Sequence, residues 1–219
     1  MFPTTRRSAL SAMRSADPAE RARGFETLVA AYWRPVYKYI RIKWSKSSED
    51  AQDLTQGFFV RAMEKQFFRG YDPARAAFRT FLRTCLDGFV ANEHQADQRL
   101  KRGGGVEVLS LDFEGAEGEL QQHPAPDGMT PEECFHREWL RSVFGLAVDT
   151  LRRECEAEGK GVHFRLFERY DLEEAGGLTY EALAAELGQP ATAVTNYLAA
   201  TRRRFRRIVL ELMGEVDSP

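Results

Sequence analysis

The sequence is poor in cysteine and has no long apolar run. Its three cysteines, Cys85, Cys134 and Cys155, are far apart and form no CxxC pair, which argues against a disulfide framework and against a zinc site. No apolar run approaches the roughly 18 residues that mark a membrane helix, and there is no cleavable apolar leader. We therefore expect a protein of the reducing cytoplasm, without membrane insertion, whose thiols are small buried side chains.

Motifs typical of enzymes are also scarce. No glycine-rich phosphate loop is present, and the glycines at 103–105 follow a basic stretch in the manner of a hinge. Acids stand beside histidine in two short stretches, Glu132, Glu133 and His136 within one turn and the neighbours Glu93 and His94. A metal site normally needs ligands that converge from more than one element. We expect no catalytic residue, no metal and no cofactor, and a helical enzyme or metal-binding protein is the weakest alternative.

Charge is unevenly distributed, although the net charge is only −2. No lysine or arginine occurs between Gly103 and His136, where the acidic residues are Glu107, Asp112, Glu114, Glu117, Glu119, Asp127, Glu132 and Glu133. Five arginines crowd a short stretch near the end: Arg202, Arg203, Arg204, Arg206 and Arg207. Such segregation indicates that different segments meet partners of different charge.

Helical periodicity dominates the sequence, and no segment alternates at period 2 for long. Apolar residues between Phe25 and Ile40 recur at i, i+3, i+4 and i+7, as in an amphipathic helix. Ser47 and Ser48 look like the N-cap of a second helix that ends near Gln66. The pattern and the length of 219 residues predict an all-α protein of two small helical domains.

The two domains are expected to be joined by an acidic linker. Residues 106–128 contain Pro124 and Pro126 and show no sustained period, so we interpret them as a linker with little fixed structure. Thr130 and Pro131 then open a new helix. The predicted organisation is an N-terminal extension at 1–19, a first domain at 20–105, the linker at 106–128 and a second domain at 129–215.

Residues 179–207 have the pattern of a helix, a tight turn and a second helix. Thr179 can cap the first helix, Gly188 allows the turn and Pro190 starts the next helix. In helix-turn-helix proteins the second helix enters the major groove of DNA. The outward positions, whose short side chains can read base edges, are Thr192, Thr195, Asn196 and Ala199. The arginine cluster is expected to contact phosphates, and a plain helical hairpin with a solvated basic tail is the alternative.

Aromatic and basic residues are mixed before and along the third predicted helix, which begins near Phe78. Rings can stack on unpaired bases while guanidinium groups hold the backbone, so the mixture suits single-stranded nucleic acid. Ordinary core packing of the same rings is the alternative. The candidate residues are Phe67, Phe68, Tyr71, Arg79, Phe81, Arg83, Asn92, Gln95, Arg99, Lys101 and Arg102.

The stretch DAQDLTQGFF, residues 50–59, predicts a helix with one unpaired acidic face. The polar positions are Asp50, Gln52, Asp53 and Gln56, followed by Gly57, and no basic residue sits among them. Glycine inside a helix costs about 1 kcal/mol relative to alanine. This face is either a solvated flank or a docking surface for a partner.

Together these motifs resemble the extracytoplasmic-function (ECF) sigma factors of bacterial RNA polymerase, within the sigma-70 superfamily. The resemblance rests on DAQDLTQGFF, FRTFLRTCLDGFVANEHQADQRLKRGGG and YEALAAELGQPATAVTNYLAATRRRFRR, and FPTTRRSAL and AYWRPVYKYIR look like one subgroup. It covers nearly the whole chain, in the family's order and spacing. It implies a sigma region 2-like bundle that binds polymerase and melts and reads the −10 element as single-stranded DNA, and a sigma region 4-like helix-turn-helix that reads the −35 element as duplex.

The resemblance also implies partners for each candidate surface. The acidic face would dock on the clamp of the largest polymerase subunits through Asp50, Gln52, Asp53, Gln56 and Gly57. The mixed aromatic and basic residues would contact the −10 element, and the helix-turn-helix positions would contact the −35 element together with Arg202, Arg203 and Arg206. The linker would thread the polymerase channel. Core RNA polymerase and promoter DNA are thus the expected partners, with an anti-sigma factor or a Ser/Thr kinase as regulators.

The sequence departs from the family's pattern at several positions. Gln52 replaces the usual Glu, Gly88 stands where many relatives have a promoter-contacting Asn, and the −35 helix lacks the usual early Arg or Lys. The charge missing at Gln52 leads to the hypothesis that phosphorylation of Thr55, Ser47 or Ser48 completes the acidic face. A free-standing helix-turn-helix regulator that does not dock on polymerase is the alternative function.

Overall fold

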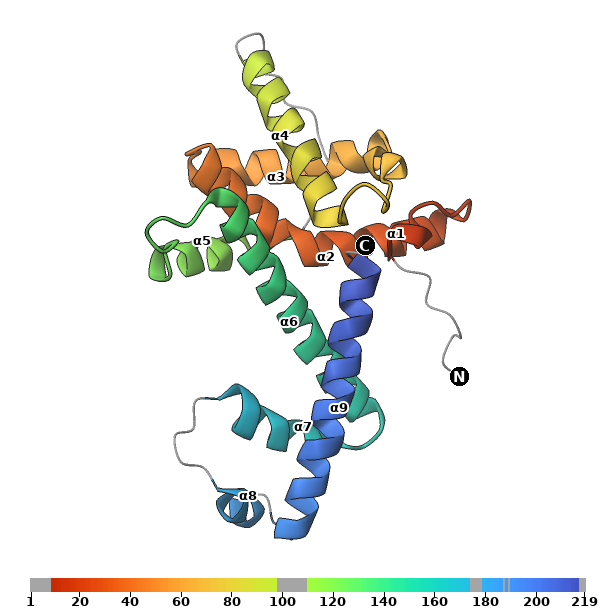
Figure 1. Cartoon of the computed structure of the whole chain (residues 1–219), viewed down its shortest axis with the longest axis vertical. Coiled ribbons are helices and arrows are strands. Elements are labelled where there is room, and N and C mark those ends of the chain that lie inside the picture. Colours follow the sequence, from red (N-terminus) through yellow and green to blue (C-terminus); the bar gives the residue numbers. More distant parts are fainter. Residues whose placement is uncertain (1–8, 98–109, 174–178, 187, 189, 217–219) are drawn as a thin grey trace. The chain divides into compact units, whose positions relative to one another are not determined.

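Figure 1 shows a computed structural model of the chain, which describes residues 9–97, 110–173, 179–186, 188 and 190–216, without the side chains of 94–97, 215 and 216. Every regular element in these ranges is helical, so the predicted all-α fold is confirmed. The residues fall into two compact units, 143–212 and the remainder. Helix α6 is uninterrupted from Pro131 to Ala157, so its residues to 142 belong to the first unit and the rest to the second.

The first unit is built around α2, which spans Pro18–Lys43. Asp17 caps this helix by accepting a hydrogen bond from the backbone N–H of Ala19, and Pro18 occupies the first turn. Its predicted apolar stripe is buried, including Tyr32, Val36 and Ile40. The helices α3, Ser48–Glu64, and α4, Phe78–Asp97, complete the predicted order, with a short 3₁₀ turn at Phe67–Gly70 between them.

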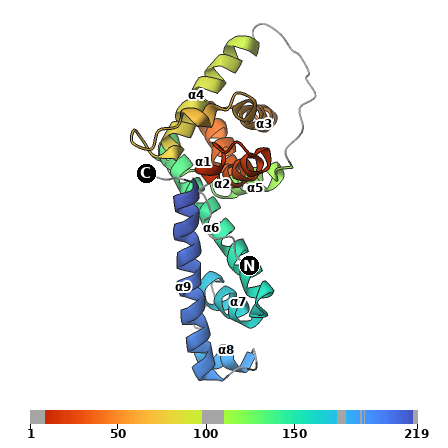
Figure 2. The same cartoon turned by 90° about the vertical axis from the view of Figure 1, so that its right-hand side faces the viewer.

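Aromatic side chains fill the core of this unit. The ring of Tyr32 on α2 meets Phe78 of α4 edge-on with centroids 5.6 Å apart, and lies 6.4 Å from Trp139 of α6. Trp139 is only 1% exposed. The N-terminal part of α6 therefore belongs to the same core as α2 and α4, and Figure 2 gives the second view of these helices.

Part of the N-terminal extension is folded onto α2. The short helix α1, Ala9–Ala12, buries Leu10 and contacts α2. The contact is close at Gly24, where a Cβ atom would lie 2.7 Å from the backbone oxygen of Ala9. A glycine is required there because any side chain would push the two helices apart.

The acidic segment carries a helix, and the prediction of little fixed structure is wrong for this part of it. Helix α5 spans Phe113–Gln122, is capped by Asp112 and contacts α2. Phe113 is buried against α2, with ring centroids 5.5 Å from Trp33 and 5.3 Å from Tyr37. Two of the carboxylates of α5, those of Glu117 and Glu119, form ion pairs with α2, which explains why this acidic segment folds against a helix.

These ion pairs are short and partly buried. Glu117 bonds to Arg41 at 2.7 Å and accepts a hydrogen bond from the Tyr37 hydroxyl at 2.6 Å. Lys38, only 3% exposed, bonds to Glu119 at 2.9 Å and to Glu138 of α6 at 2.7 Å. One buried ammonium group thus joins α2, α5 and α6 within the first unit.

Acid is expected to loosen the contact between α5 and α2. The hydrogen bond from Arg41 lowers the pKa of Glu117 from 4.5 to about 2. Because the folded-state pKa is the lower one, the stabilisation is complete above about pH 4.5 and is lost as the pH falls toward 2. The melting temperature of the wild type should therefore drop more steeply over this range than that of Glu117→Gln. Equal slopes for the two proteins would contradict this origin of the stability.

The second unit contains the rest of α6 and a predicted helix cluster. It holds α7, Gly161–Phe167, a π-helical turn at Glu168–Leu172, α8, Tyr180–Glu186, and α9, Ala191–Val216, of which residues to 212 belong to this unit. Thr179 caps α8 by accepting the N–H of Ala182 at 3.2 Å. Gly188 has a φ of +60°, a conformation that favours glycine, and it provides the turn between α8 and α9 as predicted.

Candidate protein and nucleic-acid interfaces

The acidic face of α3 is present as predicted. Ser47 caps the helix by accepting the N–H of Asp50 at 3.1 Å. The side chains of Asp50 and Asp53 are exposed, and neither forms an ion pair within the described part of the chain. Gln52 donates to Ser48 at 3.2 Å, and Gln56 is half-buried. The face therefore offers two free carboxylates to a partner, while Gln52 is held by its own helix.

Gly57 has a different environment from the one expected. A Cβ atom at this position would lie 3.4 Å from Cζ of Phe89, so the position faces α4 of the same unit. The position is therefore turned toward its own unit, and the space beside Phe89 also admits the methyl group of an alanine. The role of Gly57 in docking stays a prediction.

Substituting Gly57 by alanine tests whether a partner needs this glycine. A Cβ at 3.4 Å is within ordinary contact distance, so Gly57→Ala should raise the free energy of unfolding by up to about 1 kcal/mol through helix propensity. Urea denaturation of wild type and variant measures this. If a partner approaches this glycine closely, Gly57→Ala should bind that partner more weakly even though the variant is more stable. If no partner approaches it, binding should be unchanged.

Two of the rings predicted to stack on unpaired bases belong to the core. Phe68 is 3% and Tyr71 is 5% exposed. Both rings meet Phe78 edge-on, with centroids 5.3 Å and 5.1 Å away. The prediction that these two rings contact DNA is wrong, because core packing already covers them.

The other candidates near α4 differ in accessibility. Phe67, Phe81 and Arg83 are half-buried, and Asn92 is exposed. Arg79 is half-buried with its guanidinium 5.3 Å from the ring centre of Trp139. The side chain of Gln95 and the residues Arg99, Lys101 and Arg102 lie outside the described part of the chain. Phe67, Phe81, Arg83 and Asn92 are thus at least partly accessible, although Arg83, two residues after Phe81, points to another side of α4.

The three proposed phosphorylation sites are not equivalent. Thr55 is fully buried, and its hydroxyl donates to the backbone oxygen of Ala51 at 2.7 Å. A kinase has no access to such a group in the folded protein, so the prediction for Thr55 is wrong. Ser47 is exposed, whereas Ser48 is half-buried beside the hydroxyl of Tyr37 at 2.9 Å.

The start of α9 presents its predicted polar positions. Thr192, Thr195 and Asn196 are exposed, and Ala199 is half-buried. On the opposite side, Val194 and Leu198 are fully buried. The helix therefore separates an apolar face that holds it in its unit from a polar face that is accessible to a ligand.

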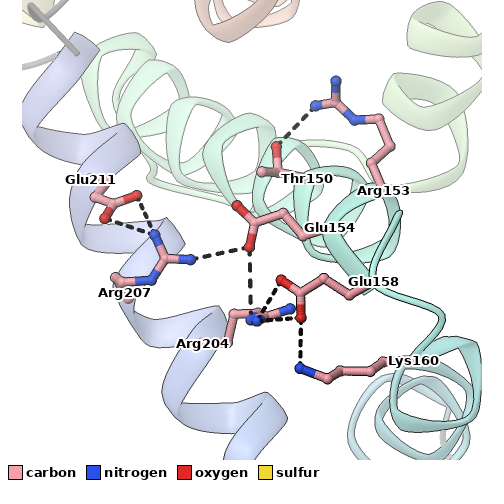
Figure 3. Close-up of polar contacts among 8 residues, drawn as sticks. All are labelled: Thr150, Arg153, Glu154, Glu158, Lys160, Arg204, Arg207 and Glu211. Carbon is pink, nitrogen blue, oxygen red and sulfur yellow. Dashed lines mark hydrogen bonds and ion pairs between the residues drawn. The ribbon is translucent and has the colours of Figure 1, made fainter. Parts of the chain in front are cut away.

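The arginine cluster divides into two classes. Arg202 grips Asp171 with two nitrogens, at 2.8 Å and 3.0 Å, which argues against its predicted role on phosphate. Figure 3 shows Arg204 and Arg207 turned toward α6, where they bond to Glu158 at 2.8 Å and to Glu154 at 3.1 Å. Arg203 and Arg206 are exposed and have no ion pair in the part of the chain that the structure describes. Continuing the spacing from Thr192 and Asn196, they lie on the same face as the polar positions.

The acid and histidine neighbours have structural roles. Glu133 bonds to the hydroxyl of Thr130 at 2.9 Å and closes the N-terminal cap of α6. Glu132 accepts from the hydroxyl of Tyr39 at 3.1 Å, and His136 stacks on Trp139. Within the described ranges, no group of three His, Cys, Asp or Glu side chains could hold a metal ion. In the same ranges, no helix is both long and apolar enough to span a membrane.

Comparison with known protein families finds a match within the first unit. Residues 28–100 match the family model of sigma-70 region 2. No curated protein sequence matches the chain. The matched segment begins in α2 and includes all of α3 and its acidic face. The match covers 73 of the 219 residues and supports a protein of the sigma-70 type through its region 2.

Proposed function

We propose that this chain is an ECF-type sigma factor, which binds core RNA polymerase and directs initiation at specific promoters. The observation that carries the proposal is the pair of exposed, unpaired carboxylates, Asp50 and Asp53, within the segment that matches region 2. Exposed acids on a rigid helix suit docking onto a basic protein surface, because complementary charge speeds association and fixes orientation. In this proposal α3 docks on the clamp of the polymerase.

The −10 element would be read by accessible residues before and along α4, with Phe67 in the turn that precedes the helix and Phe81 and Asn92 on one side of it. Extruding a base from a duplex costs a few kcal/mol, and stacking on a ring recovers about 1–3 kcal/mol per base. Two half-buried rings, supported by core neighbours such as Tyr71, offer such platforms without an exposed apolar patch. No covalent chemistry is needed, so we assign no catalytic residue.

The −35 element would be read by α9 as duplex DNA. Thr192, Thr195 and Asn196 would face base edges, and the short side chains would let the helix approach the groove closely. Arg203 and Arg206 would hold the phosphates, while Arg204 fixes the helix within its own unit. In this proposal Arg203 and Arg206 contribute to DNA binding, whereas Arg204 contributes to the stability of the fold.

This division predicts opposite effects of neighbouring substitutions. The double variant Arg203→Ala/Arg206→Ala should keep its stability within about 0.5 kcal/mol, yet lose duplex affinity and lower the salt dependence of binding by about two phosphate contacts. Arg204→Ala should instead cost about 0.5–1 kcal/mol of stability. Anisotropy on duplex DNA across a salt series and urea titrations measure the two quantities. Equal salt slopes for wild type and double variant would contradict the phosphate role.

The proposed function is tested by holoenzyme assembly followed by transcription. Purified chain is incubated with core polymerase, isolated by pull-down and used for run-off transcription from a supercoiled promoter library. We expect stoichiometric binding and discrete transcripts that are absent with core polymerase alone. Tight duplex binding without polymerase, together with no initiation, would instead favour the free-standing regulator.

A further inference from the structure

The face of α2 beneath α5 combines cations with aromatic rings. It consists of Trp33, Arg34, Tyr37, Lys38 and Arg41, which we call the α2 basic-aromatic face. The positions recur at intervals of three or four residues, so they form one stripe along the helix. The guanidinium of Arg34 lies 5.0 Å from the ring centre of Trp33. None of these residues belongs to the surfaces assigned above to polymerase or to the promoter.

Helix α5 covers this face with matching groups. Its Phe113 ring contacts the rings of Trp33 and Tyr37 at 5.5 Å and 5.3 Å. Its carboxylates meet the cations, with Glu117 on Arg41 at 2.7 Å and Glu119 on Lys38 at 2.9 Å. The Phe113 ring meets Trp33 edge-on, with 81° between the ring planes, and meets Tyr37 at a tilt of 55°. Aromatic rings beside cations are also the groups with which proteins hold the bases and phosphates of single-stranded nucleic acid.

Helix α5 is held on α2 by few buried side chains, so the whole helix can leave the α2 basic-aromatic face at once. Phe113 and Ala116 are its buried residues, and the helix from Phe113 to Gln122 is short. Isolated helices shorter than about 12–15 residues are marginal in water. Once its side chains leave α2, α5 has little reason to stay helical, so its carboxylates would withdraw together rather than one by one.

We propose that the α2 basic-aromatic face binds single-stranded nucleic acid, and that α5 occupies this face in the free protein as an internal substitute. The ring of Phe113 fills the space that a base would occupy, and the carboxylates of Glu117 and Glu119 stand where phosphates would lie. Nucleic acid and α5 compete for one surface. The proposal goes beyond the sigma-factor function, because it concerns a face of the free protein that docking on polymerase does not use.

An open variant tests the competition. The substitutions Glu117→Gln/Glu119→Gln remove the two oxyanions while Lys38 keeps its pair with Glu138. The control Glu114→Gln/Glu156→Gln removes the same net charge from two exposed carboxylates that have no ion pair in the described ranges. Anisotropy of the full chain, without polymerase, on a labelled single-stranded oligonucleotide of about 16 nucleotides should show about tenfold tighter binding for the open variant and no gain for the control. For the open variant, the slope of the logarithm of the binding constant against the logarithm of the salt concentration should steepen by about 0.7 for each newly freed cation.

Two further variants localise the gain. Adding Arg34→Ala/Arg41→Ala to the open variant should abolish the gain, whereas adding Arg153→Ala/Arg165→Ala, which removes two exposed arginines of the second unit, should retain it. Phe113→Ala keeps every charge and should also raise the affinity for the oligonucleotide. It takes the place of the open variant in these tests if circular dichroism shows that the open variant has lost native helix.

The alternatives give different results. If neither the open variant nor Phe113→Ala binds the oligonucleotide more tightly than the wild type, the proposal is overturned. Polyglutamate that binds the open variant as tightly as the oligonucleotide does would show that the face accepts any polyanion, and would favour an acidic polypeptide as its ligand. Because polymerase is absent from every measurement, failure here leaves holoenzyme assembly untouched and is distinguishable from failure of the proposed function.

Discussion

Replacing Lys38 by alanine is expected to lower the free energy of unfolding by about 1–3 kcal/mol, the cost of leaving buried polar groups without one of their partners. Lys38 is 3% exposed and bridges Glu119 and Glu138, whose side chains are 37% and 12% exposed. Without the ammonium group, Glu138 keeps a desolvated charge with no nearby lysine, although Arg141 remains bonded to its other oxygen at 2.6 Å. The loss should appear in urea denaturation as a lower midpoint with an unchanged slope.

Two comparisons isolate the buried charge as the cause. Lys65→Ala removes an exposed lysine and should change stability by no more than about 0.5 kcal/mol. The triple variant Lys38→Met/Glu119→Gln/Glu138→Gln removes all three charges and should recover most of the loss, because neutral groups carry no such desolvation cost. A Lys38→Ala protein as stable as the wild type would show that this bridge contributes nothing to joining α2, α5 and α6.

The helices could be predicted from the sequence because their signals are local. The apolar period between Phe25 and Ile40, the cap at Ser47 and the Thr130-Pro131 start all appear at their predicted places. So does Gly188, whose left-handed backbone provides the turn before α9. Each of these features depends on residues within one or two turns of the chain, which is the range that periodicity and capping patterns report.

The errors at the candidate sites have a common physical origin in long-range contacts. Phe68 and Tyr71 look like exposed loop rings until Phe78 packs against both. Residues 113–122 look like a solvated acidic tether until the cations of α2 neutralise them. Residue type and spacing do not indicate which distant side chain will cover a ring or pair with a carboxylate.

The arginine cluster illustrates the same limit. Five neighbouring guanidinium groups give one basic signal in the sequence, yet Arg202 pairs with Asp171 and Arg204 with Glu158. Helical spacing alone puts Arg203 and Arg206 on the face of Thr192. Helical spacing does not reveal that the other arginines form ion pairs with carboxylates of α6 and of the π-helical turn. Only the partners, which lie about 30 to 50 residues earlier, distinguish a structural arginine from a ligand-binding one.

Reversing the charges of Asp50 and Asp53 is expected to have the largest effect on function. Both carboxylates are exposed and without ion pairs in the described ranges, so their substitution removes no internal contact. Lysines in their place would oppose a basic docking surface, and juxtaposed like charges cost several kcal/mol. We expect Asp50→Lys/Asp53→Lys to weaken assembly with core polymerase by about 100-fold, which corresponds to about 2.7 kcal/mol.

A matched control is available on α6. Asp149→Lys/Glu156→Lys changes net charge equally at two exposed carboxylates that lie seven residues apart and outside α3. Lysine near the start of α3 opposes the helix dipole at a cost of about 0.3–1 kcal/mol per site, so urea denaturation must accompany the binding data. A protein that remains folded at the assay temperature then reports on docking alone.

The most direct test is the equilibrium affinity of core RNA polymerase for wild type, for Asp50→Lys/Asp53→Lys and for the α6 control, measured with run-off transcription on the same samples. The account predicts that the α3 variant loses both assembly and transcripts, while the control keeps both. Wild-type affinity and transcript yield from the α3 variant would show that its acidic face is a solvated flank, and would contradict the account.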